Sequence, residues 1–420
     1  MSINIRGIRG MKDVLPNETE SWQWLESHIR NITANYGYHE IRLPILEPLS
    51  LFQRAVGEAT DIVSKEMYDF VDKSGDHITL RPEGTSGCVR GIIDNNLCYN
   101  ATQRLWYQGP MFRYERPQKG RLRQFTQLGV ETFGMGGADV DAELIFMAHD
   151  LFKSLGVRDN LRLEINSLGT PVERSSHRDA LVSYFKEHIE LLDEDSLVRL
   201  EKNPLRILDS KNLAMQQMLQ EAPQLLEYLD AESREHFEKV CQLLQAAGID
   251  YTINPRLVRG LDYYTRTVFE WITDDLGAQG TVCGGGRYDG LVELFSGQSL
   301  PASGFAIGLE RLLLLIETLN INTKVKSHCK VIVTCESTEN NDAALLLSKA
   351  IRDSIKNISI VNDFSGSKLK RQHQRALKSD FDIILTLQDD LSVGVWHLEK
   401  NHRIACSQEN TLQEIEKLLL

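Results

Sequence analysis

Features that define several common protein classes are missing from this chain. Its longest uninterrupted aliphatic stretch, residues 312–316, is far shorter than the ~20 apolar residues that span a bilayer. Residues 1–7 contain no apolar segment of the length that a signal peptide needs. The seven cysteines are odd in number and no two have CxxC spacing, which argues against a disulfide framework or a zinc ribbon. We therefore expect a cytoplasmic protein with reduced thiols, no membrane segment and no metal-binding residues.

Motifs of the commonest nucleotide-binding and hydrolytic sites are also missing. The chain has no GxxxxGK[ST], no GxGxxG that opens a helix after a strand, no GxSxG and no HExxH. Its 47 basic and 59 acidic side chains give a net charge of −12, which argues against a generally cationic nucleic-acid coat protein. A local basic patch remains compatible with this charge, because binding follows the local field.

The first part of the chain mixes strand-like and helix-like segments. Its 420 residues predict two or three domains. Apolar residues at three- and four-residue steps predict an amphipathic helix over residues 18–36, and a second helix is expected just after Gly84. Residues 103–114 and 124–133 are strand-like and predict an antiparallel hairpin with a long loop, residues 115–123.

A change in composition marks residues 171–248. This segment has no glycine before Gly248, is rich in Glu, Asp, Leu and Gln, and predicts an inserted helical subdomain. Strands on both sides of such an insertion predict one α+β catalytic core with a mixed, mainly antiparallel sheet, formed by residues 1–170 and 249–320. The later strands of this core are expected at residues 263–273, 281–283 and 303–307, the last leading into a helix near Gly308.

A second domain is expected at the end of the chain. Residues 321–327 have the polar composition of a linker. Residues 328–420 then alternate between strand and helix patterns, which predicts a small α/β domain. Its strands are expected at 331–334, 358–361 and 383–387, and its helices at 343–355 and 368–377.

The segment 112–131 locally reverses the acidic sign of the chain. Guanidinium groups suit phosphate because their planar fork donates two hydrogen bonds at once. Phe125, beside them, is placed to stack a base. The alternative is a solvated, charged hairpin loop, since runs of charge usually lie at the surface. Against Glu115 and Glu131, the segment holds Arg113, Arg116, Lys119, Arg121 and Arg123.

Three further segments carry polar or glycine-rich patterns. Residues 257–264, LVRGLDYY, line a polar pocket or else form a strand edge with aromatic cross-strand pairs. The three consecutive glycines in residues 281–290 allow close backbone approach to a ligand, or a tight turn. Residues 304–311 place Arg311 in the first turn of a helix, which is also compatible with an ordinary helix start.

Together, these segments resemble the histidyl-tRNA synthetase family of class II aminoacyl-tRNA synthetases, over essentially the whole chain. Residues 8–16 resemble the family's N-terminal signature. The class-defining motifs are matched by residues 40–48 with 65–68 (the dimer-interface motif), by 112–131 and by 304–311. The segments that point to histidine are 257–264 and 285–290.

The resemblance implies an ATP site. It assigns Arg113 to the α-phosphate, Glu115 to adenine, and Phe125 to stacking on the adenine ring. Arg311 matches the arginine on the far face of adenine, near the γ-phosphate, and Gln127 lies beside the amino acid and the α-phosphate. Magnesium is expected to accompany ATP by bridging its phosphates, without a dedicated protein cage.

The resemblance also implies a histidine site. Neutral imidazole offers one donor and one acceptor, so a carboxylate and a phenol, Glu131 and Tyr264, read both nitrogens. Arg259 and Arg113 are the expected catalytic residues, since a fixed positive charge on the α-phosphate favours the in-line attack of the histidine carboxylate. The residues assigned to histidine are Glu83, Gly84, Thr85, Gln127, Glu131, Arg259, Tyr263 and Tyr264.

The activity that the resemblance implies is activation of L-histidine to histidyl-adenylate with ATP, followed by transfer to the 3′ end of tRNA(His), by a homodimer. Residues 328–420 resemble the family's anticodon-binding domain, and residues 368–378 hold five basic side chains and no acidic one. Two alternatives are a regulatory paralogue in histidine biosynthesis that does not charge tRNA, and a class II enzyme for threonine or proline. Segment 257–264 disfavours the second alternative, and the catalytic arginines and C-terminal domain disfavour the first.

Overall fold

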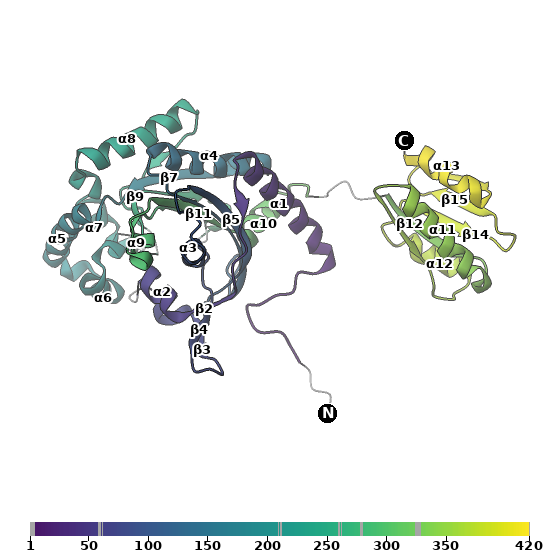
Figure 1. The fold of residues 1–420 in the computed structure, drawn as a ribbon, viewed down its shortest axis with the longest axis horizontal. Coiled ribbons are helices and arrows are strands. Elements are labelled where there is room, and N and C mark those ends of the chain that lie inside the picture. Colours follow the sequence, from purple (N-terminus) through teal and green to yellow (C-terminus); the bar gives the residue numbers. More distant parts are fainter. Residues whose placement is uncertain are drawn as a thin grey trace. The chain divides into compact units, whose positions relative to one another are not determined.

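The chain divides into two units, Met1–Thr323 and Lys324–Leu420 (Figure 1). None of the helices that the structure describes is long and apolar enough to span a membrane. The structure is a computed structural model, and it describes residues 5–419 apart from 58–59, 61, 209, 211, 259–260, 262, 278–279 and 324–328.

The first unit is built on an eight-stranded sheet. Its strand order is β1-β5-β6-β11-β10-β9-β7-β8, and only the outer pairs β1–β5 and β7–β8 are parallel within it. The predicted mixed, mainly antiparallel α+β core is therefore confirmed. The strands are β1 (His39–Glu40), β5 (Gln103–Phe112), β6 (Gln124–Phe133), β7 (Arg162–Ser167), β8 (Thr252–Ile253), β9 (Thr265–Ile272), β10 (Thr281–Arg287) and β11 (Ala302–Gly308).

The predicted hairpin of β5 and β6 is confirmed, with Phe112 opposite Gln124 in antiparallel register. The strand predicted to end at residue 283 instead continues to Arg287, so the glycine run lies inside β10. Of the two interpretations of this run, the tight turn is therefore wrong. A Cβ atom at Gly285 would lie 2.4 Å from the carbonyl oxygen of Gly304 and 2.6 Å from the Cβ of Phe305. Glycine is needed here because β10 approaches β11 closely.

Helices cover both faces of this sheet. Leu128 and Val130 of β6 pack with helices α1, α4 and α10 on one face, whereas Phe133 packs with α2, α3 and α9 on the other. Since side chains alternate along a strand, Phe125, Gln127 and Glu131 share the face of Phe133. The helices are α1 (Pro16–Asn35), α2 (Leu49–Val56), α3 (Thr85–Asp94), α4 (Ala138–Ser154), α9 (Gly290–Ser296) and α10 (Leu309–Thr318).

A three-stranded antiparallel sheet of order β2-β4-β3 lies outside the large one and was not predicted. Its strands are short, and their exposed residues give them little alternation. They are β2 (Leu46–Pro48), β3 (Tyr68–Val71) and β4 (His77–Leu80).

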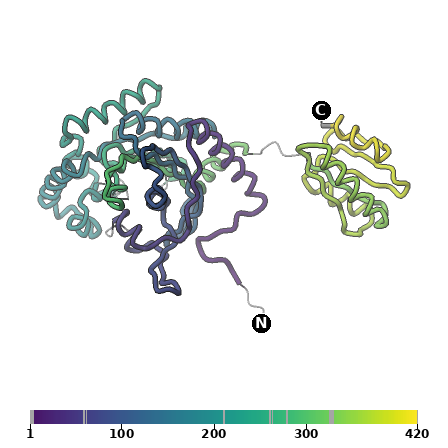
Figure 2. The backbone as a smooth tube through the Cα atoms, viewed as in Figure 1, coloured from purple at the N-terminus to yellow at the C-terminus, as the bar shows by residue number. Residues whose placement is uncertain are grey.

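The segment 171–248 is helical, as predicted, and forms a group of helices at one side of the first unit (Figure 2). Thr170 caps the first of them through a capping box with Glu173. Leu181, Phe185 and Met215 belong to a separate small apolar core. The last helix, α8, packs against α4 and so joins this group to the sheet. The helices are α5 (Pro171–Glu187), α6 (Glu194–Lys202), α7 (Gln216–Gln220) and α8 (Ala231–Ala246), with short 3-10 turns between them.

The second unit is a five-stranded sheet of order β13-β12-β14-β15-β16. The three predicted strands are its parallel part, while β15, β16 and the last helix were not predicted. Of the predicted linker, residues 324–327 lie outside the described residues. The elements are β12 (Cys329–Cys335), α11 (Asn341–Ser354), β13 (Ile358–Asn362), α12 (Leu369–Ala376), β14 (Ile383–Leu387), β15 (Val393–His397), β16 (His402–Cys406) and α13 (Gln408–Leu419).

Candidate active site

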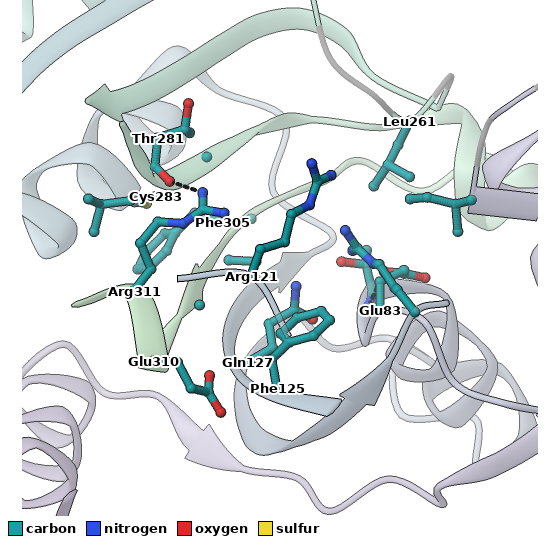
Figure 3. A pocket seen from close by; sticks show the side chains of 18 of the residues that line it. Glu83, Arg121, Phe125, Gln127, Leu261, Thr281, Cys283, Phe305, Glu310 and Arg311 are labelled. Carbon is teal, nitrogen blue, oxygen red and sulfur yellow. Dashed lines mark hydrogen bonds between the residues drawn. The ribbon is translucent and has the colours of Figure 1, made fainter. Parts of the chain in front are cut away.

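A cavity of about 270 Å³ opens on the face of the large sheet that carries α3. Strands β6, β10 and β11, the loop after β5 and the first turns of α3 and α10 form its walls (Figure 3). Of the other predicted site residues, Gly84 does not line the cavity and Arg259 lies outside the described residues. Ten predicted residues line it: Glu83, Thr85, Arg113, Glu115, Phe125, Gln127, Glu131, Tyr263, Tyr264 and Arg311.

Glu83 closes the N-terminus of α3. Its Oε2 accepts the backbone N–H of Thr85 at 2.7 Å, and its Oε1 accepts the backbone N–H of Ser86 at 3.0 Å. A carboxylate is favoured there because the first N–H groups of a helix are unpaired and carry partial positive charge. Gly84 donates its N–H to Oε1 of Gln127 at 3.0 Å. A Cβ at Gly84 would lie 2.1 Å from the ring of Tyr107, so this position requires glycine.

Glu131 is buried at the inner end of the cavity and carries three hydroxyl contacts. Its Oε1 accepts from Thr85 Oγ1 at 2.8 Å and from Tyr107 Oη at 3.0 Å, while its Oε2 accepts from the Tyr288 hydroxyl. Burial raises the pKa of Glu131 to about 8, although these hydroxyl donors oppose the shift. A Cβ at Gly304 would lie 1.9 Å from Oε2 of Glu131, so the neighbouring strand leaves room for this carboxylate only through a glycine.

Three tyrosine rings form the wall beside Glu131. The ring centres of Tyr263 and Tyr264 are 4.8 Å apart, and that of Tyr288 lies 5.5 Å from Tyr263 and 6.3 Å from Tyr264. Sequence reasoning placed Tyr288 in a motif without a role and missed Tyr107. Their only sequence signal is position: Tyr288 follows Arg287 in the segment 285–290, and Tyr107 ends the apolar run 105–107 of β5.

The other end of the cavity is cationic. The guanidinium of Arg113 donates from Nε to the carbonyl of Pro82 at 2.8 Å and lies 5.2 Å from the centre of the Phe125 ring. Arg121 forms an ion pair with Glu115. Burial, followed by the charges of Arg121 and Arg113, lowers the pKa of Arg311. Three guanidinium groups around one cavity are suited to bind phosphate.

The basic loop divides into two sets of side chains. Arg113 and Arg121 line the cavity, whereas Arg116 and Lys119 are exposed and correspond to the solvated alternative. Arg123 lies elsewhere again, over the ring of Tyr114 at 3.8 Å. Only part of the charge in this segment therefore lies at the cavity, where the phosphate-binding interpretation requires it.

Glu310 was not predicted. Both of its carboxylate oxygens accept the backbone N–H of Thr126, at 2.8 and 2.9 Å, so it ties α10 to β6 between Phe125 and Gln127. Burial raises the pKa of Glu310 to about 7. Arg311, the next residue, donates to the carbonyl of Thr281.

The site thus has two chemically different ends. Figure 3 shows Arg311 and Glu83 on opposite sides, with Arg121, Phe125 and Gln127 between them in this view. One end offers an aromatic ring and guanidinium groups, which suit a nucleotide and its phosphates. The other offers a buried carboxylate, hydroxyls and tyrosine rings, which suit a small molecule with a polar ring.

Known proteins match this chain over most of its length. A family profile described as histidyl-tRNA synthetase matches residues 10–312. The apo histidyl-tRNA synthetase of S. aureus has a TM-score of 0.81 and 33% identity, with coverage of 98% of this chain and 99% of that one. The histidyl-tRNA synthetase from Nostoc sp. PCC 7120 has a TM-score of 0.70 at 20% identity, over 99% and 100% of the two chains. A protein from Bacillus halodurans C, named as an ATP phosphoribosyltransferase regulatory subunit/histidyl-tRNA synthetase, has a TM-score of 0.66 at 22% identity, over 92% and 99%. At these last two identities the likeness concerns the fold.

Proposed function

The chain belongs to the histidyl-tRNA synthetase family, and on this premise we propose that it activates histidine with ATP and charges tRNA with the product. In the first step a carboxylate oxygen of histidine attacks the α-phosphorus of ATP, and pyrophosphate leaves. In the second, the 3′-terminal hydroxyl of tRNA attacks the carbonyl carbon, and AMP leaves. The observation that carries the proposal is one cavity with guanidinium groups at one end and Glu131 among tyrosines at the other.

ATP occupies the cationic end. Phe125 stacks on one face of adenine and the guanidinium of Arg311 on the other, while Arg113 binds the α-phosphate, where negative charge develops. Glu115 contacts adenine. The positions of Phe125, Arg113 and Arg311 around one cavity support this arrangement.

Histidine occupies the inner end. Glu83 and Thr85 take its α-ammonium group, and Gln127 lies between the amino acid and the α-phosphate. Glu131 and Tyr264 bind the two imidazole nitrogens, with Tyr263 beside them. Glu131 already accepts three hydroxyl donors, and a carboxylate has about four acceptor positions, so room remains for one N–H of the substrate. Apolar analogues would leave buried polar groups unpaired and are rejected strongly.

Arg259 is the second proposed catalytic residue. It would place a fixed positive charge on the α-phosphate as the carboxylate attacks. A protein base is unnecessary for this step, because the substrate carboxylate is ionised at neutral pH.

ATP brings Mg²⁺, which neutralises phosphate charge when bound. Within the part of the chain that the structure describes, no three metal-ligating side chains lie together. The cavity carboxylate Glu310 accepts the backbone N–H of Thr126 with both of its oxygens. We propose that the phosphates of ATP, and not a dedicated set of protein side chains, supply most of the ligands of the ion.

The decisive test is ATP–pyrophosphate exchange with each of the twenty amino acids. Histidine alone should support exchange well above background. Exchange with threonine or proline instead would identify another class II specificity. Exchange with none of the twenty, from a folded protein, would favour the regulatory alternative.

We propose a homodimer in the cytoplasm, where charged tRNA is used. The segment 40–48 resembles the interface motif and ends in β2 of the small sheet, which exposes Leu46, Phe70 and Val71. Exposed apolar groups of this kind are suited to a twofold interface. Light scattering at micromolar concentration should give twice the chain mass, and a fully active monomer would contradict the proposal.

The second unit, residues 328–420, is proposed to bind the anticodon region of tRNA. Lys370 and Arg371 are exposed on α12, and Lys378 is exposed just after it. Basic side chains of this kind suit phosphate contacts.

A chain ended at Asn320 should keep histidine-dependent exchange within about threefold, because the residues assigned to ATP and histidine belong to the first unit. Its charging of tRNA should fall at least tenfold, through weaker tRNA binding. Both activities are to be measured on the same preparation. A folded but exchange-inactive product would mean that the second unit takes part in activation, and normal charging would mean that it does not bind tRNA.

A further inference from the structure

Arg287 is a fully buried cation at the end of β10, and all five of its N–H donors have acceptors. Nε and Nη2 bind the two carboxylate oxygens of Asp141 at 3.2 and 2.6 Å. Nη1 donates to Oδ1 of Asp289 at 3.0 Å and to the carbonyl of Met135 at 3.3 Å, and Nη2 also donates to the carbonyl of Gly137 at 3.0 Å. A guanidinium held in this way has one orientation, because any rotation would leave a buried donor unpaired.

Asp141 connects this cation to the helical segment. Its Oδ2 accepts from Nε2 of His236, on α8, at 2.8 Å. The side chains of His236 and Asp141 are only 8% and 1% exposed, so the hydrogen bond lies in a dry environment. Burial would raise the pKa of Asp141, but Arg287 and His236 hold it below its ordinary value. Asp141 is therefore a carboxylate that needs donors from both sides.

Arg287 in turn fixes the residue that follows it. The backbone N–H of Tyr288 donates to the carbonyl of Ala302 at 2.7 Å, and the N–H of Ala302 donates to Oδ1 of Asp289 at 2.9 Å. The same Oδ1 accepts from Arg287. The backbone of Tyr288 is thus held on both sides, and its hydroxyl donates to Glu131. A shift of Arg287 would move this hydroxyl and the carboxylate that it orients.

We propose that His236 is a positioning residue for the amino-acid pocket, acting through Asp141 and Arg287 on Tyr288 and Glu131. The proposal rests on the proposed function, since the readout is histidine recognition. A carboxylate that binds a small substrate has to be held within a fraction of an ångström, so a loosened support reduces affinity without removing any substrate contact. The helical segment then contributes to amino-acid binding although it does not line the cavity among the described residues.

The test compares two buried histidines of the helical segment in the exchange assay. His236→Ala should raise KM for histidine about tenfold, the scale of one charge-assisted hydrogen bond, with KM for ATP within about twofold. His236→Gln keeps a donor near the position of Nε2 and should restore KM for histidine to within about twofold of wild type. The control is His177→Ala. His177 is buried on α5 and contacts the carbonyl of Pro223 at 2.7 Å, so its loss should disturb the segment without changing KM for histidine.

A double-mutant cycle identifies the route. If His236 acts through the Tyr288 hydroxyl, His236→Ala should raise KM for histidine less than twofold in a Tyr288→Phe background. If His236→Ala does not fold, His236→Asn takes its place in the comparison with His236→Gln. The asparagine side chain is shorter and has no donor at the position of Nε2.

Equal effects of His177→Ala and His236→Ala, additivity in the cycle, or an unchanged KM for histidine in His236→Ala would each overturn the proposal. In all three cases wild-type exchange with histidine remains. A folded wild-type chain without histidine-dependent exchange would instead overturn the proposed function.

Discussion

Glu131→Gln should lower kcat/KM for histidine by about 10³-fold in ATP–pyrophosphate exchange, while KM for ATP stays within about twofold. The carboxylate accepts three hydroxyl groups on its two oxygens and is proposed to accept an N–H of the substrate. An amide replaces one of these acceptors with a donor, so the site would face buried hydroxyls and the imidazole with the wrong hydrogen-bonding group. The loss therefore concerns histidine and not the nucleotide.

The matched control is Glu310→Gln. Glu310 is also a buried carboxylate that lines the cavity, but it accepts the backbone N–H of Thr126, which a glutamine carbonyl also accepts. Its kcat/KM for histidine should stay within about tenfold of wild type. Similar losses for both variants, or a Glu131→Gln enzyme with near-normal histidine kinetics, would show that Glu131 does not recognise the substrate.

The pH dependence of thermal stability gives a second test of Glu131, which does not depend on substrate binding. Burial raises the pKa of Glu131 to about 8, from its ordinary 4.5. Between these two values the folded chain without substrate keeps a proton that the unfolded chain releases, so this group makes the stability of the free protein fall as the pH rises through the window. The form proposed to accept the imidazole N–H is the ionised one, so histidine binding should release this proton. Glutamine has no such proton. The Tm of Glu131→Gln should therefore fall less than that of the wild type between about pH 5 and pH 8.

The strands that position the site differ in how well sequence predicts them. β6 was predicted from its strand-like composition, and the period of two along any strand then places Phe125, Gln127 and Glu131 on one face. The glycine run of β10 has no such composition. Its meaning depends on how closely β11 approaches Gly285, a tertiary distance that local sequence does not contain. The short strands β2, β3 and β4 were not predicted because few of their residues are buried, so their sequences carry little pattern.

Site residues show the same division. Those in motifs were assigned by resemblance, and ten of them line one cavity. The supporting residues were not found, because each acts through a partner far along the chain. Asp141 and Arg287 are 146 positions apart, and nothing in the sequence selects this acidic residue among 59 as the partner of that arginine. Such pairs are fixed by packing of α4, α8 and β10 and become visible only in the fold.

Arg113→Ala should slow histidine-dependent exchange by about 10²- to 10³-fold, the usual scale for the loss of a charge donor in the transition state. The side chain is already oriented for this role: its Nε donates to the Pro82 carbonyl and its guanidinium lies over Phe125, beside the cavity. Arg113→Lys keeps the charge but loses the planar fork, so its rate should lie between those of alanine and wild type.

Arg123→Ala is the matched control, because Arg123 lies in the same loop and carries the same charge. Its Nε donates to the Glu115 carbonyl at 3.0 Å and its guanidinium covers the Tyr114 ring, away from the cavity lining. Exchange should fall less than about fivefold, since no charge next to the α-phosphate is removed. Single-turnover pyrophosphate release measures both variants directly. If Arg113→Ala and Arg123→Ala slow pyrophosphate release equally, the effect of Arg113 reflects the overall charge of the loop. The α-phosphate would then have to be stabilised by other groups.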